Sequence, residues 1–311
     1  MFRSLQNAKL RRLLLLGAAV FTVVLLFIQY FITPGKSKGD AFRAVAQDNL
    51  ANLVALVVTS GLGLAFYHFF VKDEQELDQI RALDPQTSRL KHAHAAETSG
   101  FWYAEGQVGR WVRDNVFLAF AKRAREGMQI HDVRLALLDP RAEDLCAIHA
   151  VRRRSHLTRR EQRWDVARVQ AEICATILAS IAYCAMYDRM RIRVFLRPGS
   201  TPFRVDICTD FLFVTQDDAL APVITIMSDS KHYRSVLAYF QEYDRNEPEA
   251  IEINVQAAAN LVRKFGGPKA FRPDRYEAIA QEAGLAFPAL ADPDFCKLVQ
   301  KCCPTLRGEL T

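Results

Sequence analysis

The sequence predicts a membrane-anchored α/β protein: an N-terminal two-helix transmembrane hairpin followed by a cytosolic α/β sheet domain with a helical C-terminal part. Two long apolar runs near the N-terminus indicate the hairpin, and alternating strand-like and helix-like patterns from residue 99 indicate the sheet. Helical patterns cut by glycine and proline indicate the C-terminal part. We therefore divide the 311 residues into a basic cytoplasmic N-terminus (1–12), the hairpin (13–71), a stalk (72–98), an α/β core (99–245) and a helical cap (246–311).

The first apolar run covers residues 13–32, and its clearly polar members are Thr22 and Gln29. Its 20 residues match the roughly 30 Å hydrocarbon core of a bilayer at about 1.5 Å per residue. A signal peptide is the rival interpretation, but the run is too long and no small-residue cleavage site follows it. The second run, residues 53–71, has 19 residues broken by small residues and His68.

Small residues mark one face of the second predicted helix. Ala55, Thr59 and Gly63 recur every four residues, a spacing that lets another helix approach closely. The partner is either the first helix of the same hairpin or a second copy of the chain, so self-association remains open. Two helices enclose no pore, and neither run carries an ionisable residue at mid-depth.

Charge and cysteine content restrict the partners. The net charge of +6 and the pI near 9.0 suit contact with anionic lipid headgroups or nucleic acid. Seven cysteines lie mostly within apolar runs, which indicates reduced, buried thiols in a cytosolic domain. Adjacent Cys302 and Cys303 lack a CxxC partner, and His92, His94 and Glu97 have the pattern of a solvated surface. We expect neither a metal site nor a cofactor.

From residue 99 the pattern predicts a strand, a helix over about 111–124 and a second strand at 132–138, which together make a β-α-β unit. A long helix over about 161–190 follows. Its centre carries no charge over 14 residues, too few to span a bilayer, so we expect a buried core helix rather than a membrane span. Four further strands are expected at 191–196, 203–208, 211–215 and 223–227, before a helix at about 232–243.

The densest basic segment precedes the long helix. It contains the arginines Arg152, Arg153, Arg154, Arg159, Arg160 and Arg163. Guanidinium groups at this density can neutralise several phosphates of a nucleic acid. Lipid headgroups and a plain solvated surface are the two alternatives.

No phosphate-binding glycine loop, GxSxG turn or HExxH pair occurs in the sequence, and we assign no catalytic residue. Ser228 and Lys231 have SxxK spacing, but they lie where a predicted strand gives way to a helix, so helix capping explains the serines there more simply. Whether the protein is an enzyme stays open, and a non-enzymatic role is favoured.

The element order, with the segments VRLALLDP and RIRVFLRPGSTPFRVDICTDFLFVT, resembles half of a phospholipase D-like fold over roughly residues 99–230. The chemistry of that family requires an HxKxxxxD motif on the paired strands. Here Pro202, Arg204 and Thr209 stand where the histidine, lysine and aspartate would be. The nucleophilic histidine is absent, so the resemblance implies the fold without its phosphodiester cleavage.

The architecture of the whole chain resembles the two-transmembrane effectors of bacterial anti-phage systems, in particular those encoded with retrons. This resemblance implies a multi-pass inner-membrane toxin, kept silent by a reverse transcriptase with its RNA–DNA hybrid and released on infection to damage the membrane. The basic run would then contact that nucleic acid or its protein. The alternatives are a membrane-tethered hydrolase or nuclease of divergent phospholipase D type, and a non-catalytic membrane adaptor.

Both termini are predicted to be cytoplasmic. The basic residues that flank the hairpin are Arg3, Lys9, Arg11 and Arg12 before it and Lys72, Arg81, Arg89 and Lys91 after it. The positive-inside rule places both sets in the cytoplasm and exports the short link between the helices. Reporter fusions at residue 40 and at the C-terminus test this topology, and an exported C-terminus would contradict it.

Overall fold

The computed structural model describes residues 80–127, 130–155, 164–216 and 221–303. These residues belong to one compact unit that begins at Gln79. The predicted hairpin lies outside the described residues, with its small residues Ala55, Thr59 and Gly63. The second half of the basic run, Arg159, Arg160 and Arg163, also lies outside them.

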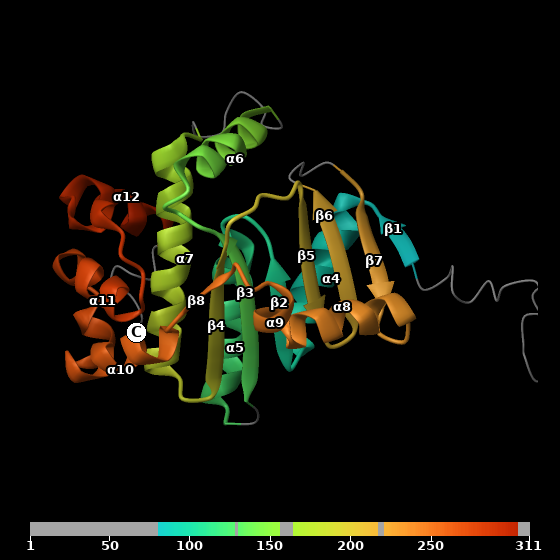
Figure 1. The fold of residues 1–311 in the computed structure, drawn as a ribbon. Coiled ribbons are helices and arrows are strands. Elements are labelled where there is room, and N and C mark those ends of the chain that lie inside the picture. Colours follow the sequence, from blue (N-terminus) through green and yellow to red (C-terminus); the bar gives the residue numbers. More distant parts are fainter. Residues whose placement is uncertain (1–79, 128–129, 156–163, 217–220, 304–311) are drawn as a thin grey trace, which may run out of the picture. The chain divides into compact units, whose positions relative to one another are not determined.

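The described residues form an α/β domain around a mixed eight-stranded sheet, as the sequence predicts (Figure 1). The strands are β1 (Ile80–Leu83), β2 (Phe101–Glu105), β3 (His131–Leu138), β4 (Met190–Arg197), β5 (Phe203–Cys208), β6 (Phe211–Gln216), β7 (Val223–Met227) and β8 (Ile251–Ile253). Their order across the sheet is β1-β7-β6-β5-β2-β3-β4-β8. Strands β2, β3 and β4 are parallel, which confirms the predicted β-α-β unit, and all other pairs are antiparallel.

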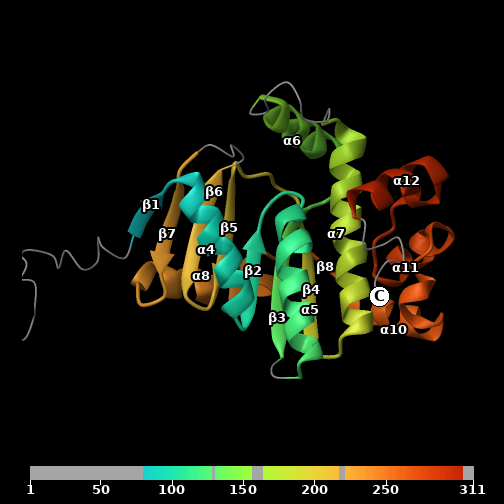
Figure 2. The ribbon, with the colours of Figure 1, turned by 180° about the vertical axis from the view of Figure 1, so that it is seen from behind.

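Helices cover both faces of the sheet. They are α4 (Pro85–Thr98), α5 (Phe117–Arg125), α6 (Glu143–Ser155), α7 (Val166–Met186), α8 (Lys231–Gln241), α9 (Tyr243–Asn246), α10 (Val255–Lys264), α11 (Tyr276–Glu282) and α12 (Pro293–Cys302), with a π-helical turn at Val112–Val116 and short 3-10 turns at Gly267–Ala270, Pro273–Arg275 and Pro288–Ala291. Helices α4, α5 and α7 lie on one face and α8 and α9 on the other (Figures 1 and 2). The main hydrophobic core lies under the first group.

Helix α7 is the centre of that core. Asp165 caps its start by accepting a hydrogen bond from the backbone N–H of Arg168 at 2.8 Å. Of the described helices, it is the one long and apolar enough to cross a membrane, but 83% of its most apolar window is buried inside the domain. This burial agrees with the predicted core helix. Helices α10 and α12 pack against α7 and form the predicted helical C-terminal part.

The predicted stalk is wrong from residue 80 onward. Ile80–Leu83 is the edge strand β1, and Pro85–Thr98 is helix α4 of the domain, capped by Asp84. The expected solvated surface is also wrong at His92, which is 4% exposed. The imidazole stacks on Phe213 with ring centroids 3.8 Å apart, because α4 packs with its alanine and histidine side against the sheet.

A buried ion pair joins the π-helical turn to α7. Glu172 is fully buried, and Arg113, from the π-helical turn, donates to its Oε2 at 2.9 Å. Arg168, one turn earlier on α7, donates to Oε1 at 2.7 Å. Arg113 also reaches the Thr176 hydroxyl at 3.3 Å. Because both carboxylate oxygens are matched by arginines, the pair fixes how the π-helical turn sits on α7.

Replacing Glu172 with Ala should therefore destabilise the domain strongly. The change leaves Arg113 buried without its counter-ion, and breaking a buried pair in this way costs about 3–5 kcal/mol. Urea unfolding of residues 80–311 measures the loss. The control is Glu252→Ala, which breaks the half-exposed pair with Arg193 and should cost at most about 1 kcal/mol. Equal effects of the two changes would contradict the role of Glu172.

Candidate ligand pocket

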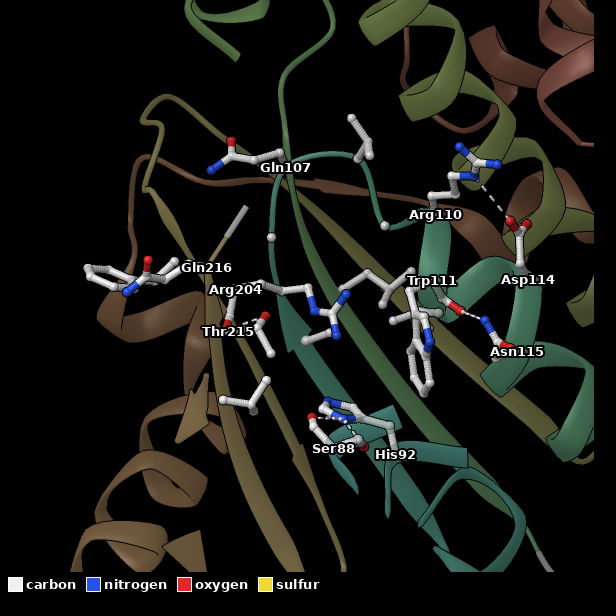
Figure 3. A pocket seen from close by; sticks show the side chains of 18 of the residues that line it. Ser88, His92, Gln107, Arg110, Trp111, Asp114, Asn115, Arg204, Thr215 and Gln216 are labelled. Carbon is white, nitrogen blue, oxygen red and sulfur yellow. Dashed lines mark hydrogen bonds and ion pairs between the residues drawn. The ribbon is translucent and has the colours of Figure 1, made fainter. Parts of the chain in front are cut away.

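A pocket of about 400 Å³ lies at the carboxyl ends of β2 and β3 (Figure 3). Its walls come from α4, from the loop after β2 with the helix that follows it, from α6, and from β5 and β6. Strands β3 and β4 lie on one side of β2 and strand β5 on the other, so the direction of strand addition reverses at β2. Ligands of open α/β sheets bind at such reversals, outside the carboxyl ends of the strands.

The loop after β2 is held close to α7. Gly109 has a φ of 66°, and a Cβ there would lie 2.8 Å from Thr176 Cγ2 and 2.9 Å from Leu137 Cδ2. The Thr176 hydroxyl donates to the carbonyl of Val108 at 2.7 Å. Glycine is therefore required at 109, for both its conformation and its size. The loop ends where a helix begins at Arg110, and the N–H groups of that first turn have no acceptor within the helix.

Asp206 on β5 organises the floor of the pocket. Its carboxylate is fully buried and accepts from the Trp102 indole N–H at 3.1 Å and from Arg204 Nε at 2.5 Å. Nε2 of His92 lies 3.9 Å from the same carboxylate. Burial opposes ionisation of Asp206, but the charge of Arg204 and the contact with His92 outweigh it and lower its pKa. The carboxylate is therefore ionised at neutral pH and holds Arg204 in place.

Ser88, His92 and Asp206 have the residue types of a catalytic triad, but their geometry does not support one. His92 Nδ1 lies 3.0 Å from the backbone carbonyl of Ser88 and 3.2 Å from the Ser88 hydroxyl. A carbonyl oxygen only accepts, so Nδ1 carries a proton and cannot take one from the serine. Ser88 is also 3% exposed. The contacts between Ser88 and His92 therefore stay within α4 and leave Ser88 without a base.

The pocket lining is strongly basic. Among the described residues that line it are Arg89, Arg110, Arg153 and Arg204, and Asp114 is the one carboxylate of that described lining. The Arg204 guanidinium lies over the Trp111 ring, 5.5 Å from its centroid, and projects into the pocket (Figure 3). Arg110 makes a 3.4 Å pair with Asp114, and both side chains are about half exposed. Burial, together with Arg153 and Arg152, lowers the pKa of nearby His149 to about 3, so this residue is neutral.

The described half of the predicted basic run lies at the rim of this pocket. Arg152, Arg153 and Arg154 form the last turn of α6. Arg153 lines the pocket and lies 4.9 Å from the centroid of the Trp164 ring. Arg152 donates to the Ser200 hydroxyl at 3.0 Å, and Ser200 in turn donates to Gln107 of the pocket at 3.4 Å. Arg154 is exposed. Contact of these arginines with phosphates stays a prediction.

Sequence reasoning missed most of the pocket. Arg89, Arg110 and Arg204 are isolated in the sequence, and none was proposed as a site residue. The available signal was Gly106 and Gly109, which stand between a predicted strand and a predicted helix. A two-glycine turn by itself is a weak indication of a binding loop.

The predicted buried thiols are confirmed, since all seven cysteines are free and buried. Burial raises the pKa of Cys146 to about 12 and that of Cys208 to about 11, so these thiols are protonated at neutral pH. No group of three or more metal-ligating side chains gathers within the described ranges. Ser230 caps α8 by accepting from the N–H of His232 at 3.1 Å, which confirms the capping interpretation of that segment.

Replacing Asp206 with Asn should destabilise the domain at neutral pH by about 2 kcal/mol, because charge-assisted hydrogen bonds are lost. The folded-state pKa of Asp206 is lowered, so its stabilisation is complete above the unfolded pKa of about 3.9 and is lost as pH falls through the folded value. The difference in free energy of unfolding between wild type and Asp206→Asn should therefore become smaller below about pH 4. Urea unfolding across pH tests this, with Asp188→Asn, whose side chain is 92% exposed, as the control. If this difference in free energy of unfolding did not change with pH, the result would contradict an ionised Asp206 carboxylate.

Comparison with known proteins adds little. No family model matches the sequence, and no curated protein matches it. Among solved structures, one match is TrmBL2, an archaeal chromatin protein whose structure is described as showing a novel mode of DNA binding. It covers 67% of both chains at 11% identity, with a TM-score of 0.27. A TM-score this low indicates neither a shared fold nor a shared function.

Proposed function

We propose that the protein is a membrane-acting effector of a bacterial anti-phage defence system, with the α/β domain as the sensor that controls its N-terminal apolar segments. One observation carries the proposal: the pocket is lined by α4, the first described helix in the chain after those segments. Residues 72–79 separate the second apolar run from β1, and Asp84 alone separates β1 from α4. A ligand that moves α4 therefore acts on the segment joined to the predicted hairpin.

Strand β1 is suited to transmit such a change. It has four residues, pairs with β7 alone and lies at the edge of the sheet, where the described chain begins (Figure 1). Ile80, Arg81 and Ala82 are exposed. A short, exposed edge strand has few contacts to lose, so its release costs little free energy compared with unfolding of the core. Helix α4, in contrast, packs on the core through His92, which is 4% exposed and stacks on Phe213.

A sensor role fits the pocket better than catalysis. Of the three phospholipase D positions, Pro202 is exposed before β5, and its ring nitrogen is part of the peptide bond and cannot act as a nucleophile. Arg204 lies in the pocket, and Thr209 accepts from the Gly100 N–H at 3.1 Å. Ser88 has no base. A hydrolase or nuclease of divergent phospholipase D type is the alternative, and turnover of phosphodiester substrates by purified residues 80–311 would favour it.

The proposed silencing partner is a reverse transcriptase with its RNA–DNA hybrid. Exposed Arg154 and the adjoining Arg152 and Arg153 support it, because a basic helix end at a pocket rim offers phosphate contacts to a nucleic acid. Release from this partner would let the hairpin damage the inner membrane. A non-catalytic membrane adaptor would not damage the membrane. Membrane damage therefore distinguishes the proposed effector from an adaptor.

Expression of the chain without partners should depolarise bacterial cells, and removal of residues 1–79 should abolish the effect, because the predicted hairpin is lost while the described α/β domain is kept. A potential-sensitive dye measures depolarisation, with immunoblots to match protein levels. An insertion of about six Gly/Ser residues after residue 79 should leave the effect but weaken its repression by the partner, since a flexible linker uncouples the domain. Full toxicity from residues 80–311 alone would overturn the proposal.

A further inference from the structure

We infer that the pocket binds the phosphate group of a small phosphorylated molecule. The inference rests on the proposed sensor function, because it names the class of ligand that the α/β domain would detect. Arg89 on α4, Arg110 after β2 and Arg204 on β5 lie on three walls of one cavity. Three arginines from separate elements around a space of about 400 Å³ place positive charge on several sides of it, as a bound anion requires.

The arginines keep unused hydrogen-bonding capacity. Arg89 makes no ion pair with the part of the chain that the structure describes. Arg204 uses Nε for Asp206, and its two terminal nitrogens donate to none of the described residues. Asp206 therefore orients Arg204 without covering the two N–H-bearing nitrogens that face the cavity (Figure 3). An arginine held by its Nε and open at its ends suits bidentate contact with two phosphate oxygens.

The start of the helix at Arg110 adds donors on the same side. The N–H groups of Arg110, Trp111 and Val112 lie in the first turn, and all three residues line the pocket. Together with the π-helical turn, this helix runs from Arg110 to Arg125, so its dipole places partial positive charge at the pocket. The turn before it requires Gly109, which fixes where the helix begins. Helix N-termini that follow a glycine-containing turn bind phosphate in other α/β folds.

The charge and shape of the cavity select among anions. A phosphate monoester carries up to two negative charges and three terminal oxygens, which match donors on three walls. A planar carboxylate would leave one wall of donors unmatched. The volume excludes a duplex but admits a nucleotide or sugar phosphate. Thr215 and Gln216 on β6 supply polar groups, and Val108 and Leu137 supply apolar surface, for the rest of such a molecule.

Calorimetry of the full chain in detergent tests the inference. The ligands are pyrophosphate, AMP, glucose 6-phosphate and glycerol 3-phosphate, the last as a lipid-headgroup probe, with adenosine, glucose and citrate as controls. We expect saturable binding of at least one phosphate compound and none of the controls. Arg89→Ala and Arg110→Ala should each weaken binding about tenfold, because each removes a charge-assisted contact. Arg245→Ala, at a side chain 76% exposed on α9, should change nothing.

Thermal melts establish that each variant is folded, and Arg89→Gln replaces Arg89→Ala if the latter melts early. Absence of saturable binding by the folded wild type would overturn the inference. Equal affinity in wild type and both pocket variants would overturn it as well, since binding would then occur elsewhere. The assay involves no cells, so its failure is distinct from failure of the effector proposal, which depolarisation decides.

Discussion

The buried carboxylate of Asp206 is the constraint on which the pocket depends. It joins Trp102 of β2, Arg204 of β5 and His92 of α4, so one charge aligns two strands and the helix that covers them. A buried carboxylate is costly unless it is matched, and here an arginine and an indole N–H match it. The same contacts aim Arg204 into the cavity. The ion pair between Asp206 and Arg204 therefore both stabilises the fold and places a positive charge in the pocket.

A second buried carboxylate, Glu172, does the same for the opposite wall. Through Arg113 it fixes the π-helical turn on α7, and Thr176 on the next turn of α7 holds the loop that contains Gly109. Helical turns of π type occur often at functional sites, because they displace a helix face by one residue. Here the turn lets Arg113 point into the core while Trp111 and Asp114 face the pocket. Two buried charges thus position two walls of one cavity.

The sequence predicted the sheet well where apolar alternation was bounded by turn residues. Phe203–Cys208 and Val223–Met227 match their expected bounds residue for residue. Helix α4 was mistaken for a stalk because its buried face consists of Ser88, His92 and alanines, which give no apolar period. Strand β8 was missed because three residues carry no pattern. The pocket was beyond sequence reasoning, since its arginines come together through strand order, which a single sequence does not reveal.

The proposed function depends on where the pocket-lining helix α4 lies in the sequence, shortly after the N-terminal apolar segments. Helix α4, the first described helix of the domain, is itself a wall of the pocket. On helix α4, Arg89 makes no ion pair with the described residues, and it comes one residue after Ser88, whose hydroxyl lies 3.2 Å from His92 Nδ1. In the proposed function, a ligand bound by Arg89 acts on α4, whose His92 stacks on Phe213 of the sheet. Detaching β1 from the sheet requires less free energy than unfolding the core, because β1 is short and exposed. The proposed sensor function would couple binding in the pocket to release of β1 through this one helix.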